Sequence, residues 1–468
     1  MHRRHGLVFC QTLTAQLANI GSDRHWDPEV THNPTQADSA FRELVRAFGR
    51  IGLINFGGPA GQIALMHKHL VHDRKWIAES DFLHALNFCH LLPGPEAQQL
   101  ATYIGWRLHG VRGGLAAGLL FVAPGALVML ALSALYAFAA HLGWFAALFL
   151  GIKAAVLAIV VQALLRIAGR TLDTHFKQAL AVAAFFALFL FNLPFPLIVL
   201  GSGLLGLMVS AWRPQWLVKA HQVETENVGD RPNWRSTALT VSVWLLIWFA
   251  PLALIGMALG PDHILSKIGV FFSQLAVVTF GGAYAVLAYM AQEAVQSFGW
   301  LQPGEMADGL GLAETTPGPL IMVTQFVGFL AAFRAPEPFT PLLAGLAGAA
   351  LTTWVTFAPC FLWIFACAPW IDRLRHATRL KGGLAAITAT VVGVIGNLSA
   401  WFALHVLYAR VDAIDVGVAR FSVPVWSSFD GIAAALAALA FVLMFVVRWN
   451  IVRTLGICAG AGLLASLL

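Results

Sequence analysis

The sequence predicts an all-α polytopic membrane protein made of two inverted repeats with broken or re-entrant helices, joined by an extra transmembrane helix. Three observations lead to this prediction: the composition, a duplicated set of Gly/Pro motifs, and opposite charges on equivalent loops. Of the 468 residues, 59% are hydrophobic and only 11% are charged. Soluble proteins carry about 25% charged residues. The apolar surface of this chain is therefore expected to face a lipid bilayer.

The predicted membrane-spanning segments are long stretches without Asp, Glu, Lys or Arg. One span requires about 20 apolar residues. The stretches are 113–152, 178–212, 236–261, 268–292, 338–371 and 382–409. Several of them match one span each, and the first two are long enough for two spans joined by a tight turn.

The net charge of +6 does not indicate a nucleic-acid partner, because the basic residues are scattered in short loops between apolar stretches. This pattern is typical of cytoplasmic loops in membrane proteins. The five cysteines, Cys10, Cys89, Cys360, Cys367 and Cys458, form no CxxC pair. We interpret them as small core residues, and we expect no cofactor.

An internal repeat is visible as three landmarks that recur 224 positions later. The pairs are Phe56-Gly57-Gly58 with Phe280-Gly281-Gly282, Pro93-Gly94-Pro95 with Pro317-Gly318-Pro319, and Trp76 with Trp300. Pro124 matches Pro359 if the second copy contains 11 extra residues, which the loop Arg334–Pro341 can largely hold. Duplicated halves are a common construction of secondary transporters.

The repeat defines the expected domains. Residues 1–39 form an uncleaved cytoplasmic tail, 40–212 the first repeat, and 264–468 the second repeat. Between the repeats, 213–263 contains a polar linker and a connecting transmembrane helix at about 236–260. The polar segment 410–426 receives no role.

Equivalent loops of the two repeats differ in charge. The loop 67–79 carries Lys68, Arg74 and Lys75, whereas its counterpart 291–303 has no Lys or Arg. Conversely, the turn at 141–143 lacks basic residues, and its counterpart 371–381 carries four. Because basic loops remain cytoplasmic, the repeats are predicted to be inverted, with the N-terminus inside and the C-terminus outside.

Two segments of the first repeat, about 51–66 and 82–106, are predicted to begin and end on the cytoplasmic side. Each is interrupted by Gly and Pro, which favours re-entrant hairpins or paired half-helices. Short full crossings at each break are the alternative. Full crossings are expected at about 114–140, 144–165, 178–192 and 195–212.

The Gly/Pro breaks are the predicted binding site. Proline removes a helical hydrogen bond, glycine permits close approach, and each new helix N-terminus presents free N–H groups that attract anions. Two inverted halves would bring four breaks together near the midplane. The predicted substrate-binding residues are Asn55, Phe56, Gly57, Gly58, Pro93, Gly94, Pro95, Gln98, Lys153, Phe280, Gly281, Gly282, Thr316, Pro317, Gly318 and Pro319.

Charged residues in apolar surroundings are costly and usually functional. Lys153 is predicted to balance a bound dianion or to pair with Glu96; snorkelling to the interface is the alternative. Glu96 and Glu314, beside the two breaks, are candidates for gating or proton coupling. A helix cap or a structural ion pair would explain both glutamates equally well.

Several other polar residues give weak signals. Candidate hydrogen-bond donors are Gln62, Asn87, Gln98, Gln99, Gln274, Thr324 and Gln325, and Thr315 with Thr316 could cap a half-helix. The residues His67, His69, His72 and Asp73 resemble a metal cluster. Helical spacing does not place these four on one face, so we expect no metal site.

The motifs Phe56-Gly57-Gly58-Pro59, Pro93-Gly94-Pro95, Gly105 and Gly113-Gly114, with their second copies, resemble the long-chain, two-domain members of the chromate ion transporter family. The resemblance covers about 40–400. It implies a multi-pass protein of the bacterial inner membrane that exports chromate and confers chromate resistance. Membrane potential, and protons as a second source, would drive such efflux.

Other functions stay open at this point. The substrate could be another anion such as sulfate, and the protein could be an anion channel. An integral membrane enzyme is disfavoured because no Asp/His cluster has convincing metal or nucleophile spacing. The expected partners are chromate or a related oxyanion and the lipid bilayer, and the sequence leaves a homodimer open.

Overall fold

The computed structural model describes residues 34–56, 58–140, 142–217, 234–280, 283–371, 378–417 and 419–466. The chain divides into two units, Met1–Glu43 and Leu44–Leu468. The described part of the first unit is the start of helix α2 (Pro34–Ile54). The fold and the site below belong to the second unit. The predicted site residues Gly57, Gly281 and Gly282 lie outside the described residues, as does most of the predicted tail.

Among the described residues, six helices are long and apolar enough to cross a membrane. They are α5 (Glu96–Ala139), α6 (Gly143–Thr171), α8 (Phe195–Trp212), α9 (Trp234–Leu259), α14 (Pro341–Cys367) and α16 (Thr378–Leu407). Shorter apolar helices are α7 (His175–Phe191), α17 (Gly431–Phe441) and α18 (Ile451–Ala465). The prediction of an all-α polytopic membrane protein is confirmed.

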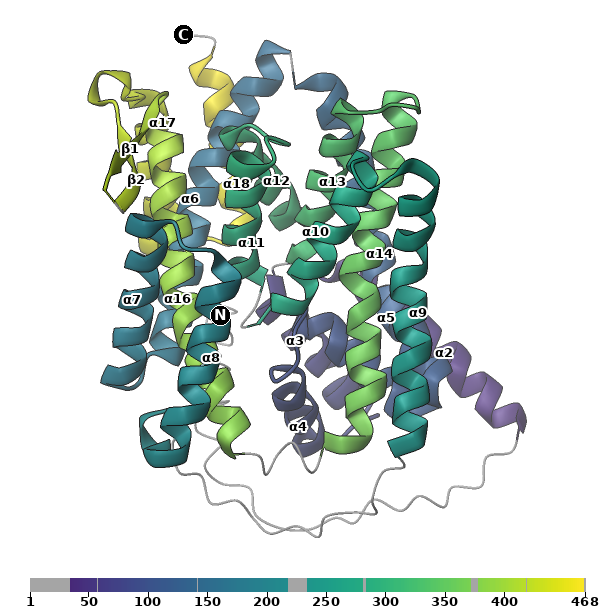
Figure 1. The fold of residues 1–468 in the computed structure, drawn as a ribbon. Helices are drawn as coiled ribbons and strands as arrows, with labels where there is room; N and C mark the ends of the chain where they lie inside the picture. The colour runs from purple at the N-terminus through teal and green to yellow at the C-terminus, as the bar shows by residue number, and fades with distance from the viewer. Residues whose placement is uncertain are drawn as a thin grey trace. The chain divides into compact units, whose positions relative to one another are not determined.

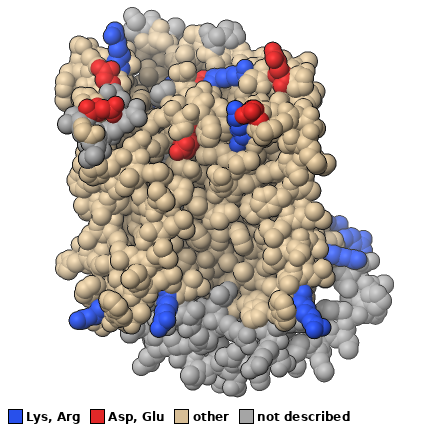
Figure 2. Space-filling view, viewed as in Figure 1, with Lys and Arg blue, Asp and Glu red and all other residues tan. Residues whose placement is uncertain are grey.

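Large apolar side chains cover the outside of these helices. Leu127 on α5, Leu246 on α9 and Leu197 on α8 are all more than 60% exposed. On the face drawn in Figure 2, the charged side chains gather toward the two ends and leave a broad belt without charge between them. Such a belt would be unstable in water and is stabilised by lipid.

The two halves contain the same order of elements around their breaks. In the first half, α3 (Gly58–His67), a short π-helix (Lys68–Asp73) and α4 (Glu79–Cys89) precede α5. The second half contains α10 (Ile264–Val278), α11 (Ala283–Gln292), a π-helix (Glu293–Ser297), α12 (Pro303–Thr315) and α13 (Val323–Arg334). In Figure 1, α3 and α4 lie in the lower part, and α11 and α12 in the upper part.

The helices on either side of the breaks are half-length. Helices α3, α4, α11 and α12 have 10, 11, 10 and 13 residues. At 1.5 Å per residue each is about 15–20 Å long, whereas the hydrocarbon core is about 30 Å thick. The end of α4 also packs against the middle of the first α5 segment, with 5.7 Å between the Phe88 and Tyr103 ring centroids. The π-helical turns continue α3 to Asp73 and α11 to Ser297, and each continuous segment is still shorter than the roughly 20 residues of one span. This favours re-entrant hairpins, which stay a prediction.

Helix α5 is two helices that meet at a sharp bend. His109 and Gly110 have non-helical backbone angles, and Gly110 has a φ of 59°. Past the bend, Gly113 approaches Gly105 so closely that a Cβ on either glycine would collide with the other's carbonyl. Gly348 on α14 approaches Gly328 on α13 in the same way. Gly113 and Gly348 are separated by the same interval as Pro124 and Pro359, which supports the predicted insertion of 11 residues.

A small β-hairpin is the one part of the described chain that departs from the helical plan. Strands β1 (Val411–Val416) and β2 (Ala419–Pro424) pair antiparallel, with Val411 opposite Pro424. This hairpin lies within the polar segment 410–426, which has no predicted role.

Replacing Gly113 by valine should destabilise the protein, because the new side chain would separate the two α5 segments. Overpacking of this kind costs about 1–3 kcal/mol, so the thermal unfolding temperature in detergent should fall. The matched control is Gly201→Val on α8, where a Cβ would meet open space. Equal unfolding temperatures for both variants would contradict the helix contact.

Candidate functional site

The four breaks meet in crosswise pairs that join the two halves. The Gly94 N–H donates a 2.7 Å hydrogen bond to the Thr279 carbonyl. The Gly318 N–H donates to Asn55, at 2.6 Å from its side-chain Oδ1 and 3.3 Å from its carbonyl oxygen. Thr279 and Asn55 are 224 positions apart, as are Gly94 and Gly318. The same contact is therefore made twice, with the halves exchanged, which is the signature of a two-fold relation.

The prolines inside the long helices lie beside the two Pro-Gly-Pro breaks. Gly125, next to Pro124 on α5, contacts the Pro317 carbonyl and the Gly318 Cα. Cys360, next to Pro359 on α14, has its sulfur beside Gly94. The equivalent partners again exchange halves. Each Pro-Gly-Pro break is thus in contact with one break and one long helix of the other half.

Gly94 and Gly318 can be nothing but glycine here. Their φ angles are +124° and +103°, a region that other residues rarely adopt. A Cβ on Gly318 would lie 3.1 Å from the Gly125 Cα, and one on Gly94 would lie 2.9 Å from the Cys360 sulfur. The positive φ angles call for glycine at both positions, and the close neighbours leave little room for a Cβ.

Buried amide side chains hold the breaks in place. Asn55 and Gln62 are 0% and 1% exposed. The Gln62 Nε2 donates to the carbonyls of Asn55 and Gly318, and the Gln99 Nε2 donates to the Pro93 carbonyl at 2.7 Å. The sequence ranked Gln62 and Gln99 only as weak donor candidates. Their partners are the carbonyls that the breaks leave without a helical hydrogen bond.

Helix N-termini follow all four breaks. Helices α3 and α11 begin at Gly58 and Ala283. Helix α5 begins directly after Pro95, and a 3₁₀ turn (Leu320–Met322) that leads into α13 begins directly after Pro319. Each proline therefore precedes the first helical residue. First-turn N–H groups have no partner within a helix, so this region offers donors and positive dipole ends to an anion.

Other predicted donors are engaged within their own helices. The Thr316 and Thr315 hydroxyls donate to the Ala313 and Leu312 carbonyls, at 3.2 and 2.8 Å. The Gln98 Nε2 donates to the Thr102 hydroxyl at 3.0 Å. Phe56 is 43% exposed, whereas Phe280 packs against the main apolar core. None of these side chains contributes a donor to the breaks in this conformation.

The two glutamates beside the breaks have neutral or titratable partners. Glu96 Oε1 is 3.0 Å from His90 Nδ1, across the first Pro-Gly-Pro break. The Tyr284 hydroxyl on α11 donates to Glu314 Oε1 at 2.6 Å, and Glu314 is 2% exposed. The sequence did not single out His90 or Tyr284. Both lie within four residues of a Gly/Pro motif, which was the available signal.

Lys153 pairs with Asp308 on α12, and the predicted pairing with Glu96 is wrong. The Lys153 Nζ is 3.4 Å from Asp308 Oδ2, and the Tyr136 hydroxyl donates to the same oxygen at 2.7 Å. Helices α6 and α12 pack together, and this brings Lys153 to Asp308. Asp308 is 2% exposed, and an isolated aspartate in an apolar segment was the overlooked signal.

The Lys153–Asp308 pair should behave as a structural unit. Removing one partner of a buried pair leaves an uncompensated charge, which costs about 3–5 kcal/mol. Lys153→Met and Asp308→Asn should each lower the unfolding temperature in detergent. The double variant should lose less than the sum of the two losses. Strict additivity would show that the two side chains do not interact.

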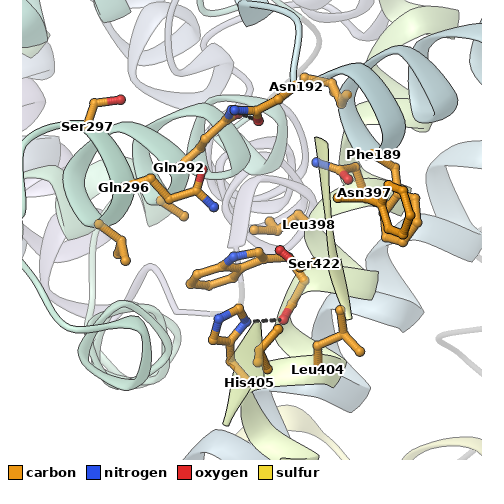
Figure 3. A pocket seen from close by; sticks show the side chains of 16 residues that line it. Phe189, Asn192, Gln292, Gln296, Ser297, Asn397, Leu398, Leu404, His405 and Ser422 are labelled. Atoms are coloured by element: carbon orange, nitrogen blue, oxygen red, sulfur yellow. Dashed lines mark hydrogen bonds between the residues drawn. The ribbon is translucent and has the colours of Figure 1, made fainter. Parts of the chain in front are cut away.

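A polar cavity lies at the far end of α11, away from the break that precedes this helix. Its volume is about 380 Å³. Its walls come from α7, α11, α16 and the β-hairpin (Figure 3). The polar lining residues are Asn192, Gln292, Gln296, Ser297, Asn397, Trp401, His405 and Ser422. The described lining contains no Lys, Arg, Asp or Glu, so the cavity offers uncharged hydrogen-bonding groups.

Comparison with known proteins identifies related transporters. The family described as chromate transporter matches residues 42–207 and 266–463. A chromate transport protein of Pseudomonas aeruginosa is 30% identical over 407 residues, covering 84% of this chain and 91% of that protein. A probable chromate transport protein of Synechococcus elongatus is 27% identical, covering 76% and 83%. A chromate transport protein of Cupriavidus metallidurans is 28% identical, covering 76% of this chain and 80% of that protein.

No solved structure matches the chain. The relatives are named as transport proteins and not as enzymes. Together with the six long apolar helices, they place the protein in the inner membrane as a multi-pass protein. The sequence matches, the duplicated motifs and the membrane fold lead to one conclusion: the chain belongs to the chromate transporter family.

Proposed function

We propose that this protein exports chromate, or a similar tetrahedral oxyanion, from the cytoplasm, and that the paired breaks hold the anion. The observation that carries the proposal is the crosswise contact of Gly94 with Thr279 and of Gly318 with Asn55. It supports a site to which the starts of α3, α5, α11 and the turn before α13 all contribute. The substrate class comes from the names of the relatives.

Backbone N–H groups suit a substrate that must be released again. An oxyanion that leaves water loses strong hydrogen bonds, and first-turn amides replace them without a fixed opposite charge. Lys153 is held by Asp308, so we no longer expect it to neutralise the dianion directly. Glu96 lies at the start of α5 and would repel the anion while ionised. We therefore propose that Glu96 and Glu314 carry protons during turnover and act as gates.

We propose further that the two repeats, 40–212 and 264–468, are inverted about an axis in the membrane plane. The exchanged hydrogen bonds support a two-fold relation, and the positions of α3–α4 and α11–α12 in Figure 1 support opposite orientations. Rocking of one hairpin against the other would open the anion site at the four breaks first to one side of the membrane and then to the other.

The charge of the two repeats differs where the substrate would enter and leave. Asn397, Trp401 and His405 line the neutral cavity. Beyond the insertion of 11 residues the repeat interval is 235, so their counterparts on α6 are Gln162, Arg166 and Arg170. A basic cytoplasmic entrance and a neutral exit would favour capture inside and release outside. A dianion leaving a negative interior gains about 4.6 kcal/mol per 100 mV, twice the value for one charge.

Transport assays with the break glycines test this proposal. Inverted membrane vesicles that contain the protein should take up radiolabelled chromate when the membrane potential is inside-positive. Gly94→Leu and Gly318→Leu should each lower the uptake at least tenfold while the protein stays in the membrane, because both positions reject a side chain. Gly201→Leu on α8, which faces open space, is the control.

Normal chromate uptake by both break variants would refute the proposal that the anion binds at the breaks. Stronger competition by sulfate than by unlabelled chromate would leave the proposed binding site standing but show that sulfate is the better substrate. Flux that does not saturate with chromate concentration would indicate a channel. Crosslinking of the purified protein in lipid would show whether it forms a homodimer.

Inverted repeats predict opposite accessibility of two equivalent loop positions. Asp73 and Ser297 are exposed, and they lie 224 positions apart at the ends of the two π-helices. In a background with the native cysteines replaced, Ser297→Cys should react with a membrane-impermeant maleimide in intact cells. Asp73→Cys should react only after the membrane is opened. Labelling of both from one side would reject the inversion.

A further inference from the structure

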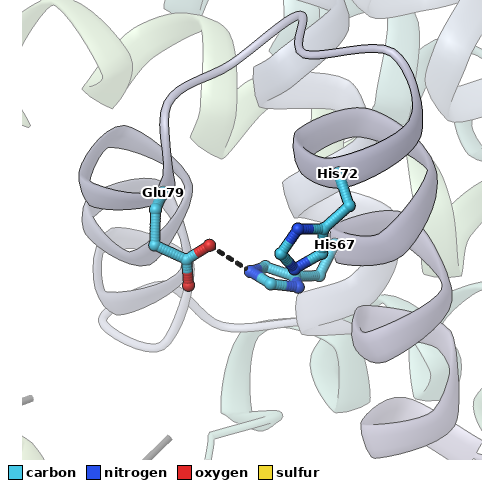
Figure 4. Close-up of side chains that lie close together, drawn as sticks. All are labelled: His67, His72 and Glu79. Atoms are coloured by element: carbon cyan, nitrogen blue, oxygen red, sulfur yellow. Dashed lines mark hydrogen bonds and ion pairs between the residues drawn. The ribbon is translucent and has the colours of Figure 1, made fainter. Parts of the chain in front are cut away.

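We propose that His67, His72 and Glu79 form a binding site for a divalent transition-metal ion, of which Zn²⁺ is the best probe. The three residues lie on the first hairpin, where the end of α3, the π-helix and the start of α4 meet (Figure 4). One potential ligand atom from each lies within 4.8 Å of the others. Metal binding is independent of the transported substrate, whereas its effect on transport, inferred below, rests on the proposed function.

The π-helix is what brings the two histidines together. In an α-helix, residues five apart point about 140° away from each other, since each residue turns the chain by about 100°. In a π-helix the hydrogen bonds run between residues i and i+5, so residues at this spacing are close to aligned. The His67 and His72 ring centroids are 4.9 Å apart. The sequence argument against a metal cluster assumed α-helical spacing and so missed this pair.

The third ligand reaches the histidines from α4. Glu79 Oε2 is 2.7 Å from His67 Nε2. His67 is 5% exposed, whereas His72 is exposed and Glu79 is half-buried. The site is therefore anchored by a buried residue and open to solvent on one side. Two imidazole nitrogens and one carboxylate oxygen form a ligand set that binds Zn²⁺ at about 2.0–2.2 Å and leaves a fourth position for water.

The ligand set is confined to these three residues and is not shared by the neighbouring or the equivalent positions. His69 pairs with Asp73 at 3.1 Å and takes no part in the three-ligand group. In the second hairpin, the equivalent positions are Ala291, Gln296 and Pro303. None of these three can provide a histidine or carboxylate ligand. Of the two equivalent hairpins, the first one therefore has this ligand set and the second one lacks it.

A bound ion would connect the two arms of the first hairpin. His67 and His72 belong to the arm that follows the break at 55–57, and Glu79 begins the arm that leads to the break at 90–95. A metal bridge would restrain any motion of one arm against the other. We therefore infer that occupancy slows transport, and that the ion acts as an inhibitor from the side that carries this loop.

Metal titration of the purified full-length chain, carrying no histidine tag, tests the site. Zn²⁺ competition against a chromogenic chelator should show a site that His72→Ala and Glu79→Gln each weaken at least tenfold. His69→Ala, one turn away, should leave the affinity within twofold. Co²⁺ should give the visible absorption of a four-coordinate ion, and His72→Ala should abolish it.

The His72→Ala variant separates metal binding from folding, because its exposed side chain leaves the His67–Glu79 pair intact. Its unfolding temperature without metal should equal that of the parent, and added Zn²⁺ should raise the temperature of the parent alone. The proposal is overturned if Zn²⁺ binds the parent and His72→Ala equally, or if 100 µM Zn²⁺ leaves the parent unchanged. Equal slowing of chromate flux by Zn²⁺ in both would overturn the inhibitory role.

Discussion

The structure depends on the need to satisfy backbone polar groups where helices are broken inside a bilayer. Lipid supplies no hydrogen bonds, so an interrupted helix survives at membrane depth only beside protein or water. Here each half supplies what the other lacks. The Gly94 N–H finds the Thr279 carbonyl, and the Gly318 N–H finds Asn55. A single half could not complete these bonds, which gives a physical reason for the duplicated chain.

The same constraint accounts for the chemistry of the candidate site. Carbonyls at the breaks are occupied by Gln62 and Gln99, and the Gly94 and Gly318 amides are occupied by the opposite half. The donors that remain are the first-turn amides of the four half-helices. Such a site would hold an anion by dipoles instead of a fixed positive charge, since Lys153 is already paired with Asp308. Weak, replaceable donors suit a transporter better than a tight binding protein.

Much of the fold followed from the sequence because its signals are local. Apolar length predicted the helices now seen at 111–139, 143–171, 175–191 and 195–212, within a few residues at most ends. The repeat interval predicted that Pro124 matches Pro359 across an insertion, and the contacts of Gly125 and Cys360 support this pairing. Whether the repeats are inverted stays a prediction, since loop charge is statistical evidence.

Partners between distant segments could not be predicted. Nothing in the sequence joins Lys153 to Asp308, because that contact depends on how α6 packs against α12. The exchange of partners between breaks likewise needs the three-dimensional arrangement, although convergence of the breaks was expected. The π-helix at Lys68–Asp73 could not be predicted from α-helical spacing, and it changes which histidines face each other.

Chromate export by the proposed route requires an oxyanion to bind where the four breaks meet. An electron-microscopy structure of the protein in lipid with saturating chromate would show whether it does. Density for a tetrahedral anion is expected within hydrogen-bond distance of the first-turn amides after Pro95 and Pro319. Chromate density elsewhere, for example in the cavity lined by Asn397 and His405, with the breaks empty, would contradict it.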